Sequence, residues 1–165
     1  MNRTCIVVAD IRLARVYCTE AVDSPRVKMK LVEQASLSNL GANLKALGRS
    51  TSGRTRTETN TNREAGPMHP IGAQRERHRL ELDRRFCQEI ARETAAVTKE
   101  WKEGAVVLVA EPRQLGLMRE PLRHVLHQGI ELKELAKDYT NLTPAELCKR
   151  LTLGSLLPAR HGGVQ

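Results

Sequence analysis

The chain has 165 residues, an aromatic content of 2% and a formal net charge of +8. This length is enough for one domain with a substantial core, and the scarcity of aromatic residues means that the core must be aliphatic. The sequence holds no apolar run of about 18 residues, and charges interrupt its first apolar segment early, so neither a membrane span nor a secretion signal is expected. We therefore expect a cytoplasmic protein with no membrane partner, and its basic charge favours nucleic acid or the ribosome.

Three strands are predicted in the first part of the chain. The first covers residues 3–9, where a continuous apolar run begins at Cys5. A short turn at residues 10–12 leads into a second strand over residues 13–18, and a third strand follows over residues 27–33. Sequential strands with short links form an antiparallel meander.

The strand pattern fails from residue 36 onward, and residues 36–74 are expected to form one long basic loop. Residues 48–70 are almost free of apolar side chains, so they cannot bury enough surface to order themselves. Between residues 45 and 79, eight cations stand against three anions, which gives a local net charge of 8 − 3 = +5. Most of these cations are arginines, and guanidinium is the better ligand for phosphate. The loop is therefore predicted to contact a polyanion.

A long amphipathic helix is predicted after a turn of small residues at positions 71–74, and it should end near Gly104. Apolar and small residues recur on one face of this helix: Leu82, Phe86, Ile90, Ala91, Thr94, Val97 and Trp101. The arginines near the helix start lie mostly off that face, where free backbone N–H groups also attract anions. One face can therefore pack on a sheet while the helix start presents guanidinium groups.

The rest of the chain predicts alternating strands and helices. The most apolar run, residues 105–110, is a strand, and a helix follows from Pro112 to near Gly129. Pro121 lies inside that helix and predicts a kink or a break, because proline cannot donate the backbone hydrogen bond. Residues 130–135 form a further strand.

The last helix is predicted to start with a capping box, in which Thr143 caps, Pro144 takes the first position and Glu146 completes the box. The order of elements indicates a single α/β domain over residues 1–155, with a mixed sheet, an N-terminal antiparallel meander and helical crossovers. Residues 156–165 are expected to form a flexible tail.

Neither a metal nor another cofactor is expected. The four cysteines form no CxxC pair and have no histidine at ligand spacing, so they are interpreted as small buried hydrophobic residues. These cysteines are Cys5, Cys18, Cys87 and Cys148. His124 and His127 can share a helix face but lack a third ligand. No phosphate loop, dinucleotide fingerprint or nucleophile elbow is present.

Four segments resemble one bacterial family. They are VVADIRLARVY near the N-terminus, HRLELDRRFCQEIARE in the long helix, VVLVAEPRQLGLMREPLR around the apolar strand, and KDYTNLTPAELCKRL near the C-terminus. Together they resemble the host attachment proteins, described as required for attachment to host cells, over nearly the whole chain. That family is similar in fold to the central domain of the archaeal and eukaryotic class-one release factor, so the resemblance implies a ribonuclease-H-like topology.

In the release factor, a Gly-Gly-Gln tip lies just before a long helix and reaches the peptidyl transferase centre. Gly72-Ala73-Gln74 occupies the matching place in this chain. The alanine departs from the motif because it resists the φ > 0 conformation that glycine permits, which argues against hydrolysis of peptidyl-tRNA. The resemblance implies a role in translation, such as ribosome hibernation or rescue, with the ribosome, ribosomal RNA or transfer RNA as partner.

Three functions are therefore compared. The first is a non-catalytic module that binds ribosomal RNA or transfer RNA through the basic loop and the helix start. Its expected nucleic-acid-binding residues are Arg49, Arg54, Arg56, Arg63, Gly72, Gln74, Arg75, Arg77, Arg79 and Arg113. The second is an enzyme, either a peptidyl-tRNA hydrolase in which Gln74 positions water or a nuclease that uses Asp10 and Glu111. The third is a protein–protein adaptor in which leucines at positions 37, 40, 44 and 47 dock a partner.

Overall fold

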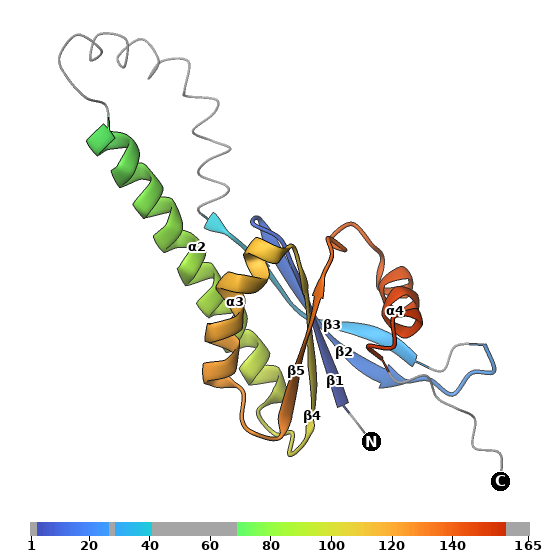
Figure 1. The fold of residues 1–165 in the computed structure, drawn as a ribbon. Coiled ribbons are helices and arrows are strands. Elements are labelled where there is room, and N and C mark those ends of the chain that lie inside the picture. The colour runs from blue at the N-terminus through green and yellow to red at the C-terminus, as the bar shows by residue number, and fades with distance from the viewer. Residues whose placement is uncertain (1–2, 27–28, 41–68, 158–165) are drawn as a thin grey trace.

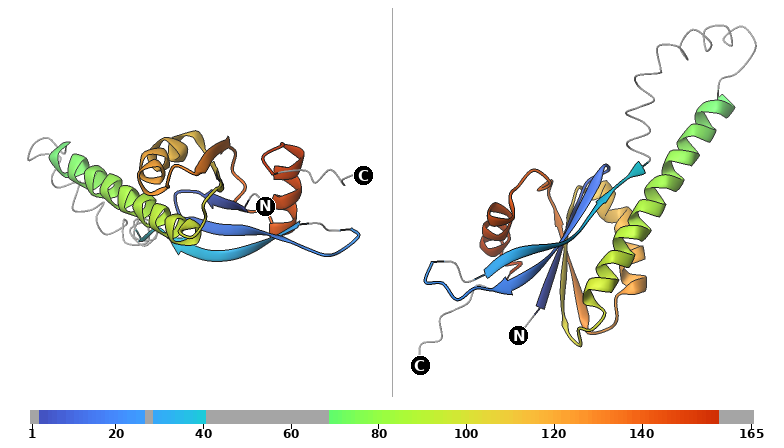
Figure 2. Two further views of the ribbon diagram at one scale, coloured as in Figure 1. Left: turned by 90° about the horizontal axis from the view of Figure 1, so that it is seen from below. Right: turned by 180° about the vertical axis from the view of Figure 1, so that it is seen from behind.

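The computed structural model of the chain describes residues 3–26, 29–40 and 69–157. A five-stranded sheet has the order β3-β2-β1-β4-β5. Its strands are β1 (Arg3–Ala9), β2 (Leu13–Ala21), β3 (Met29–Ser38), β4 (Gly104–Ala110) and β5 (Ile130–Ala136). The described helices are α2 (His69–Thr98), α3 (Pro112–Val125) and α4 (Pro144–Leu153). Figure 1 shows the sheet between α2 and α3 on one side and α4 on the other, and Figure 2 gives two further views.

The strand pairing confirms the predicted mixed sheet with an N-terminal meander. β1 pairs with β2 and β2 pairs with β3 in antiparallel register. β4 lies parallel to both β1 and β5, and α3 makes the crossover from β4 to β5. Parallel strands need such a crossover because a tight hairpin returns the chain in the opposite direction and can join only antiparallel strands.

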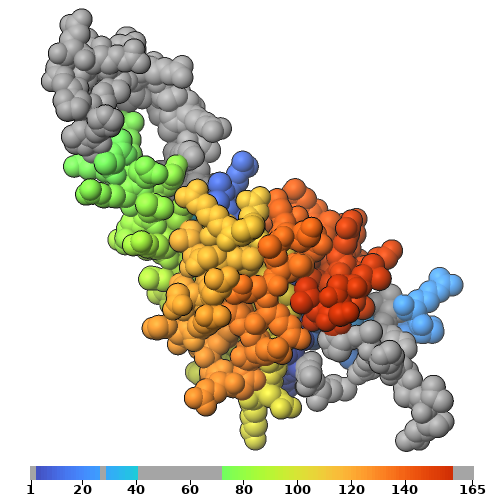
Figure 3. Space-filling model, in the orientation of Figure 1, coloured from blue at the N-terminus to red at the C-terminus, as the bar shows by residue number. Residues whose placement is uncertain are grey.

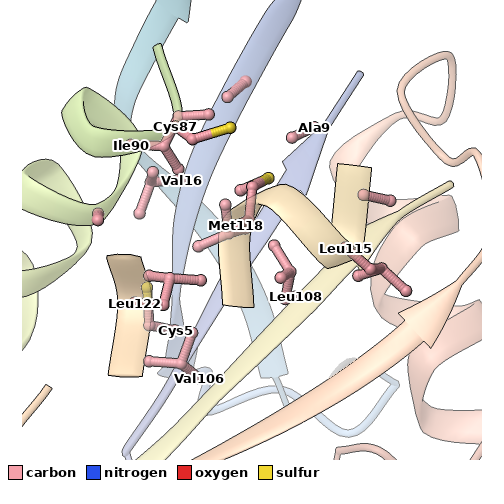
Figure 4. Close-up of a cluster of buried hydrophobic side chains, with 14 of the residues drawn as sticks. Cys5, Ala9, Val16, Cys87, Ile90, Val106, Leu108, Leu115, Met118 and Leu122 are labelled. Atoms are coloured by element: carbon pink, nitrogen blue, oxygen red, sulfur yellow. The ribbon is translucent and has the colours of Figure 1, made fainter. Parts of the chain in front are cut away.

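Side chains alternate between the two faces of the central strand β1. Cys5 and Val7 belong to the hydrophobic cluster under α2 and α3, and Ile6 and Val8 belong to the cluster under α4. Figure 4 shows the first cluster, where Ile90 of α2 and other apolar side chains meet the sheet. Burying each large aliphatic side chain of this kind stabilises the fold by about 1.5–3 kcal/mol. The core is aliphatic, as the composition predicts.

The expected loop over residues 36–74 is too long at its beginning. β3 continues to Ser38, where it pairs with Leu13 at the start of β2. Ala35 and Leu37 are half-buried against the cluster under α2, whereas Ser36 is exposed, so the strand keeps its alternation. β2 is likewise longer than predicted, because the paired β3 satisfies its backbone as far as Ala21.

The expected loop is also too long at its end, because α2 begins at His69 and includes the predicted turn at residues 71–74. The helix ends at Thr98 rather than near Gly104, and a turn follows in which the N–H of Trp101 donates to the carbonyl of Thr98 at 3.0 Å. This turn buries the Trp101 indole beside the sheet. The rest of the predicted loop, residues 41–68, lies outside the described residues.

The predictions for α3 and α4 have different outcomes. The break predicted at Pro121 does not occur, because α3 continues through this residue as far as Val125. The capping box of α4 is confirmed: the N–H of Glu146 donates to Oγ1 of Thr143 at 3.3 Å, and the N–H of Thr143 donates to the Glu146 carboxylate at 2.9 Å. Pro144 occupies the start of this helix, as predicted. The predicted tail lies largely beyond the described residues, which end at Leu157.

Candidate nucleic-acid interface

Only the second half of α2 packs on the sheet, although the helix is 30 residues long. Among the described side chains, Phe86 is the first in the helix to be buried. Residues 72–85 are exposed or half-buried, and at 1.5 Å per residue they extend for about 20 Å. Figures 1 and 3 show this part projecting beyond the body of the molecule. We call residues 72–85 the arm.

A buried asparagine connects the arm to the sheet. Nδ2 of Asn39 donates to the carbonyl of Ile11 at 2.8 Å and to Oδ1 of Asp83 at 2.9 Å. The backbone N–H of Asn39 also donates to the carbonyl of Arg12 at 2.7 Å. One side chain thus connects the end of β3, the turn between β1 and β2, and the last part of the arm. This hydrogen-bonded junction fixes the place where α2 leaves the sheet.

Several arginines of the arm have no carboxylate partner among the residues that the structure describes. Within the described part of the chain, no ion pair or hydrogen bond involves the exposed side chains of Arg75, Arg77 and Arg84. Two other arginines are paired along the helix, Arg79 with Glu76 at 3.5 Å and Arg85 with Glu81 at 3.3 Å. Such exposed pairs contribute little stability and are easily exchanged. The arm therefore presents positive charge to solvent.

Two exposed arginines of the arm repeat along one side of α2. Arg77 and Arg84 are seven residues apart, so they lie within about 20° around the helix axis and about 10 Å apart along it. Arg92 is also exposed, just over two turns beyond Arg84, but it lies about 80° around the helix axis from Arg84. The fully buried Ile90 lies about 120° around the axis from Arg84, and Ala91, seven residues after Arg84 on the same side, is also buried, so this side is exposed only along the arm. We call Arg77 and Arg84 the outer row.

The predicted tip Gly72-Ala73-Gln74 is not a loop. All three residues are exposed in the first turns of α2, and none has a left-handed backbone. Small residues are compatible with a helix as well as a turn, and here the helix continues through them. Gln74 remains on the arm with Arg75, Arg77 and Arg79, so the structure brings these predicted binding residues together.

The remaining predicted binding residues lie elsewhere. Arg113 is exposed in the first turn of α3, at the end of the sheet from which the arm projects (Figure 1). The other predicted arginines fall outside the described residues: Arg49, Arg54, Arg56 and Arg63. Of the four leucines proposed as an adaptor surface, two are described by the structure and two lie outside the described residues. Leu37 is half-buried in β3 and Leu40 is 71% exposed, and the other two are not described.

The two carboxylates proposed for a nuclease, those of Asp10 and Glu111, lie in a hairpin turn and at a helix start. Asp10 and Glu111 follow the parallel strands β1 and β4, so they lie at the same edge of the sheet. Oδ1 of Asp10 accepts hydrogen bonds from the N–H groups of Arg12 and Leu13 at 2.6 and 2.8 Å, which shapes the hairpin turn. Glu111 is the exposed N-cap of α3. Among the described residues, no group of three His, Cys, Asp or Glu side chains could hold a metal ion.

Three features near α3 were not predicted. Arg119 forms two hydrogen bonds of 2.7 Å with Glu134 of β5, and these bonds lower the pKa of Glu134. His127 binds the carbonyl of Trp101 through Nε2 and accepts the N–H of Gly129 at Nδ1, so this histidine supports a turn. A hollow of about 460 Å³ lies between α2 and α3, with Arg92 at its rim. Such contacts join distant parts of the chain and have no local signal in the sequence.

One family of known proteins matches the chain over most of its length. The profile of a family described as "protein required for attachment to host cells" matches residues 5–151. The chain belongs to this family. No curated protein matches it. The host attachment family match extends from within β1 to within α4, so the arm is part of the region that defines the family. Within the described residues, no helix of this family member is long and apolar enough to cross a membrane.

Proposed function

We propose that this host attachment family member binds RNA of the translation machinery, on the ribosome or in transfer RNA, without catalysing a reaction. The observation that carries the proposal is the exposed arm, on which Arg75, Arg77 and Arg84 have no carboxylate partner among the described residues. A projecting helix can enter a groove or lie along a phosphate backbone without moving the sheet. The guanidinium groups of the arm can then reach phosphates directly.

The arrangement of the arginines suits contact with phosphates. Guanidinium groups bind phosphate oxygens in a planar, two-bonded geometry, and Arg77 and Arg84 repeat along one side of the helix. Phosphate neutralisation releases counterions, so the affinity should depend steeply on salt. Each arginine that contacts a phosphate contributes about 0.7–0.9 to the slope of log K against log salt concentration.

The position of the aromatic residues indicates which part of RNA is recognised. The chain has one Phe, one Trp and two Tyr residues. Phe86, Trp101 and Tyr17 are buried, and Tyr139 is half-buried in the cluster under α4. None of the Phe, Trp and Tyr rings is therefore exposed, so among the described residues stacking on unpaired bases would depend on histidines such as His78 or on arginine. The proposed partner is structured RNA, recognised through its backbone.

The sheet and the predicted tip support binding rather than hydrolysis. The strand order β3-β2-β1-β4-β5 is compatible with the ribonuclease-H-like arrangement of the release-factor central domain, which the resemblance implies. However, Gly72-Ala73-Gln74 lies within a helix, where its backbone cannot form an extended tip. Asp10 already accepts two backbone hydrogen bonds in its turn, so it is a poor candidate for metal-dependent chemistry.

Cosedimentation with ribosomes and fluorescence anisotropy with a labelled RNA hairpin test the proposal. The variant Arg75→Gln/Arg77→Gln/Arg84→Gln should lose binding at about 150 mM salt and should reduce the salt slope by about 2–3. A matched control removes three exposed cations away from the arm: Arg26→Gln/Lys149→Gln/Arg150→Gln.

The control variant should bind as the wild type does, apart from a small general effect of charge. The proposal fails if the wild type binds neither ribosomes nor the hairpin, or if the arm variant and the control weaken binding equally. An acidic polysaccharide is included as a competitor because the family description refers to attachment to host cells. If the polysaccharide binds more tightly than RNA, the arm recognises a different polyanion and the proposal is wrong.

A further inference from the structure

Two cysteines lie directly opposite each other on neighbouring strands. Cys5 of β1 and Cys18 of β2 are partners in the antiparallel register, and both thiols are free. Directly opposed residues project from the same face of a sheet, so the two Sγ atoms are neighbours. Both side chains belong to the hydrophobic cluster under α2 and α3. Nothing in the family description assigns a role to this pair.

Opposed residues of an antiparallel ladder are either hydrogen-bonded or non-hydrogen-bonded pairs, and the surrounding hydrogen bonds show which type Cys5 and Cys18 form. The N–H and the carbonyl of Thr4 both bond to the hydroxyl group of Thr19 on β2, at 3.3 Å each. The N–H of Asp10 likewise donates to the first carbonyl of β2, at 2.9 Å. Backbone groups alternate along a strand, so even-numbered residues of β1 bond to β2 and odd-numbered ones, including Cys5, bond to β4. Cys5 and Cys18 therefore form a non-hydrogen-bonded pair.

This pair type meets the distance requirement for a disulfide. Residues in non-hydrogen-bonded pairs have Cα atoms about 4.5 Å apart, and their side chains approach more closely than in the other type. Disulfides span Cα separations of about 4.4–6.8 Å. A bond between Cys5 and Cys18 thus needs side-chain rotation rather than movement of the strands.

The two thiols are not equivalent. Cys5 has no exposed surface, whereas Cys18 is half-buried. The hydrogen bond with Cys5 lowers the pKa of Cys18, while burial and Glu20 oppose this effect and Arg3 assists it. The same hydrogen bond and burial raise the pKa of Cys5. Cys18 is therefore the thiol that ionises first and that an oxidant reaches first.

We propose that Cys5 and Cys18 form a site of reversible oxidation, at which hydrogen peroxide converts the two thiols into a disulfide between β1 and β2. The Cys18 thiolate attacks one peroxide oxygen, the O–O bond breaks, and hydroxide leaves as Cys18 becomes a sulfenic acid. The Cys5 sulfur then attacks the Cys18 sulfur, the S–S bond forms, and the S–O bond breaks. Hydroxide leaves again, and the two protons from the thiols convert both hydroxides to water.

This proposal depends only on the sheet and is independent of RNA binding. To test it, the purified chain is treated with hydrogen peroxide, alkylated under denaturing conditions and measured by intact-mass spectrometry. The wild type should lose two of its four alkylatable thiols, and a dithiol reductant should restore both. Proteolytic peptides should contain the Cys5–Cys18 link, and the oxidised form should unfold at a higher temperature than the reduced form.

Single variants separate this site from general oxidation. Cys18→Ser and Cys5→Ser should each form no intramolecular disulfide. Cys148→Ser is the matched control, because Cys148 is also half-buried but lies against the other face of the sheet. It should lose two thiols as the wild type does. Because Cys18 is half-buried, its variant remains informative if Cys5→Ser does not fold.

Three results would overturn the proposal. The first is that the treated wild type keeps all four alkylatable thiols. The second is that peroxide converts Cys18 to a sulfinic acid without a cross-link. The third is that the disulfide includes Cys87, which is 2% exposed in the same cluster and whose pKa burial raises to about 11.

Discussion

Gly129 should tolerate no side chain, because it lies against the backbone at the base of the sheet. A Cβ atom at this position would lie 2.0 Å from the carbonyl oxygen of Lys102 and 3.2 Å from Cε1 of His127. The carbonyl of Gly129 also accepts the N–H of Gly104 at 3.1 Å, which joins the starts of β4 and β5. The substitution Gly129→Ala therefore requires the turn before β5 to move by about 1 Å.

The expected loss of stability follows from these contacts. Overpacking against backbone atoms costs about 1–3 kcal/mol, and loss of the hydrogen bond from Gly104 adds about 1 kcal/mol. Gly129→Ala should therefore lower the free energy of unfolding by about 2–4 kcal/mol. With a urea dependence of about 2 kcal/mol per M, the midpoint of urea unfolding should fall by about 1–2 M.

Gly116 provides the matched control for this experiment. It lies inside α3, and a Cβ atom added there would have no atom of another part of the chain within 4 Å, so alanine meets open space. Gly116→Ala should raise the free energy of unfolding by about 0.5–1 kcal/mol, because alanine loses less backbone entropy in a helix. Equal midpoints for Gly129→Ala and the wild type would show that the turn is loosely packed and that the reasoning is wrong.

Two further predictions concern charged and polar contacts. The pKa of Glu146 is lowered by the backbone N–H of Thr143 and then by its hydroxyl group. A lowered folded-state pKa gives stability that is present above the ordinary carboxyl pKa of about 4.3 and is lost as pH falls through the folded-state pKa. Urea unfolding at pH 7 and pH 3 should therefore show a larger acid-dependent loss for the wild type than for Glu146→Gln, and equal losses would contradict this. Asn39→Asp should place a second carboxylate beside Asp83 and destabilise the fold at pH 7, with a smaller effect as pH falls towards about 4. An Asn39→Asp variant with the same destabilisation at both pH values would exclude charge repulsion as the cause.

Local patterns in the sequence were sufficient for the centre of the fold. β1 and β4 are continuous apolar runs that are buried on both faces, and both strands have nearly the predicted bounds. α4 has the cap that Thr143 and Glu146 predict. These features depend on residues within one turn or one strand of each other. The mixed sheet follows from the order of such elements.

Features that depend on distant partners were not predicted. The last residues of β3 look polar in sequence, but β2 pairs with them as far as Ser38. The Arg119–Glu134 ion pair joins α3 to β5 across a turn. The pairing of Cys5 with Cys18 depends on the register between β1 and β2, which the residues around each cysteine do not indicate and which one residue of slippage would remove.

The helical structure of the arm needs support from contacts with the rest of the chain, because an isolated helix of its length is only marginally stable in water. Residues 72–85 contribute no fully buried side chain, and the polar side-chain contacts that support them within the described part of the chain are the Glu76–Arg79 and Glu81–Arg85 pairs and the Asn39–Asp83 hydrogen bond. Each of these is worth about 1 kcal/mol or less. The arm should therefore open locally more often than the rest of α2.

If phosphates bind the outer row, they should stabilise the helical form of the arm and slow this opening. Amide hydrogen exchange over residues 72–85 should become slower when a structured RNA is added, while exchange in the buried half of α2 should change little. In the Arg75→Gln/Arg77→Gln/Arg84→Gln variant, RNA should produce no such change. Equal protection of the arm and the buried half in the free protein would show that the arm is held by contacts other than those identified, and the coupling between binding and helix stability would then be absent.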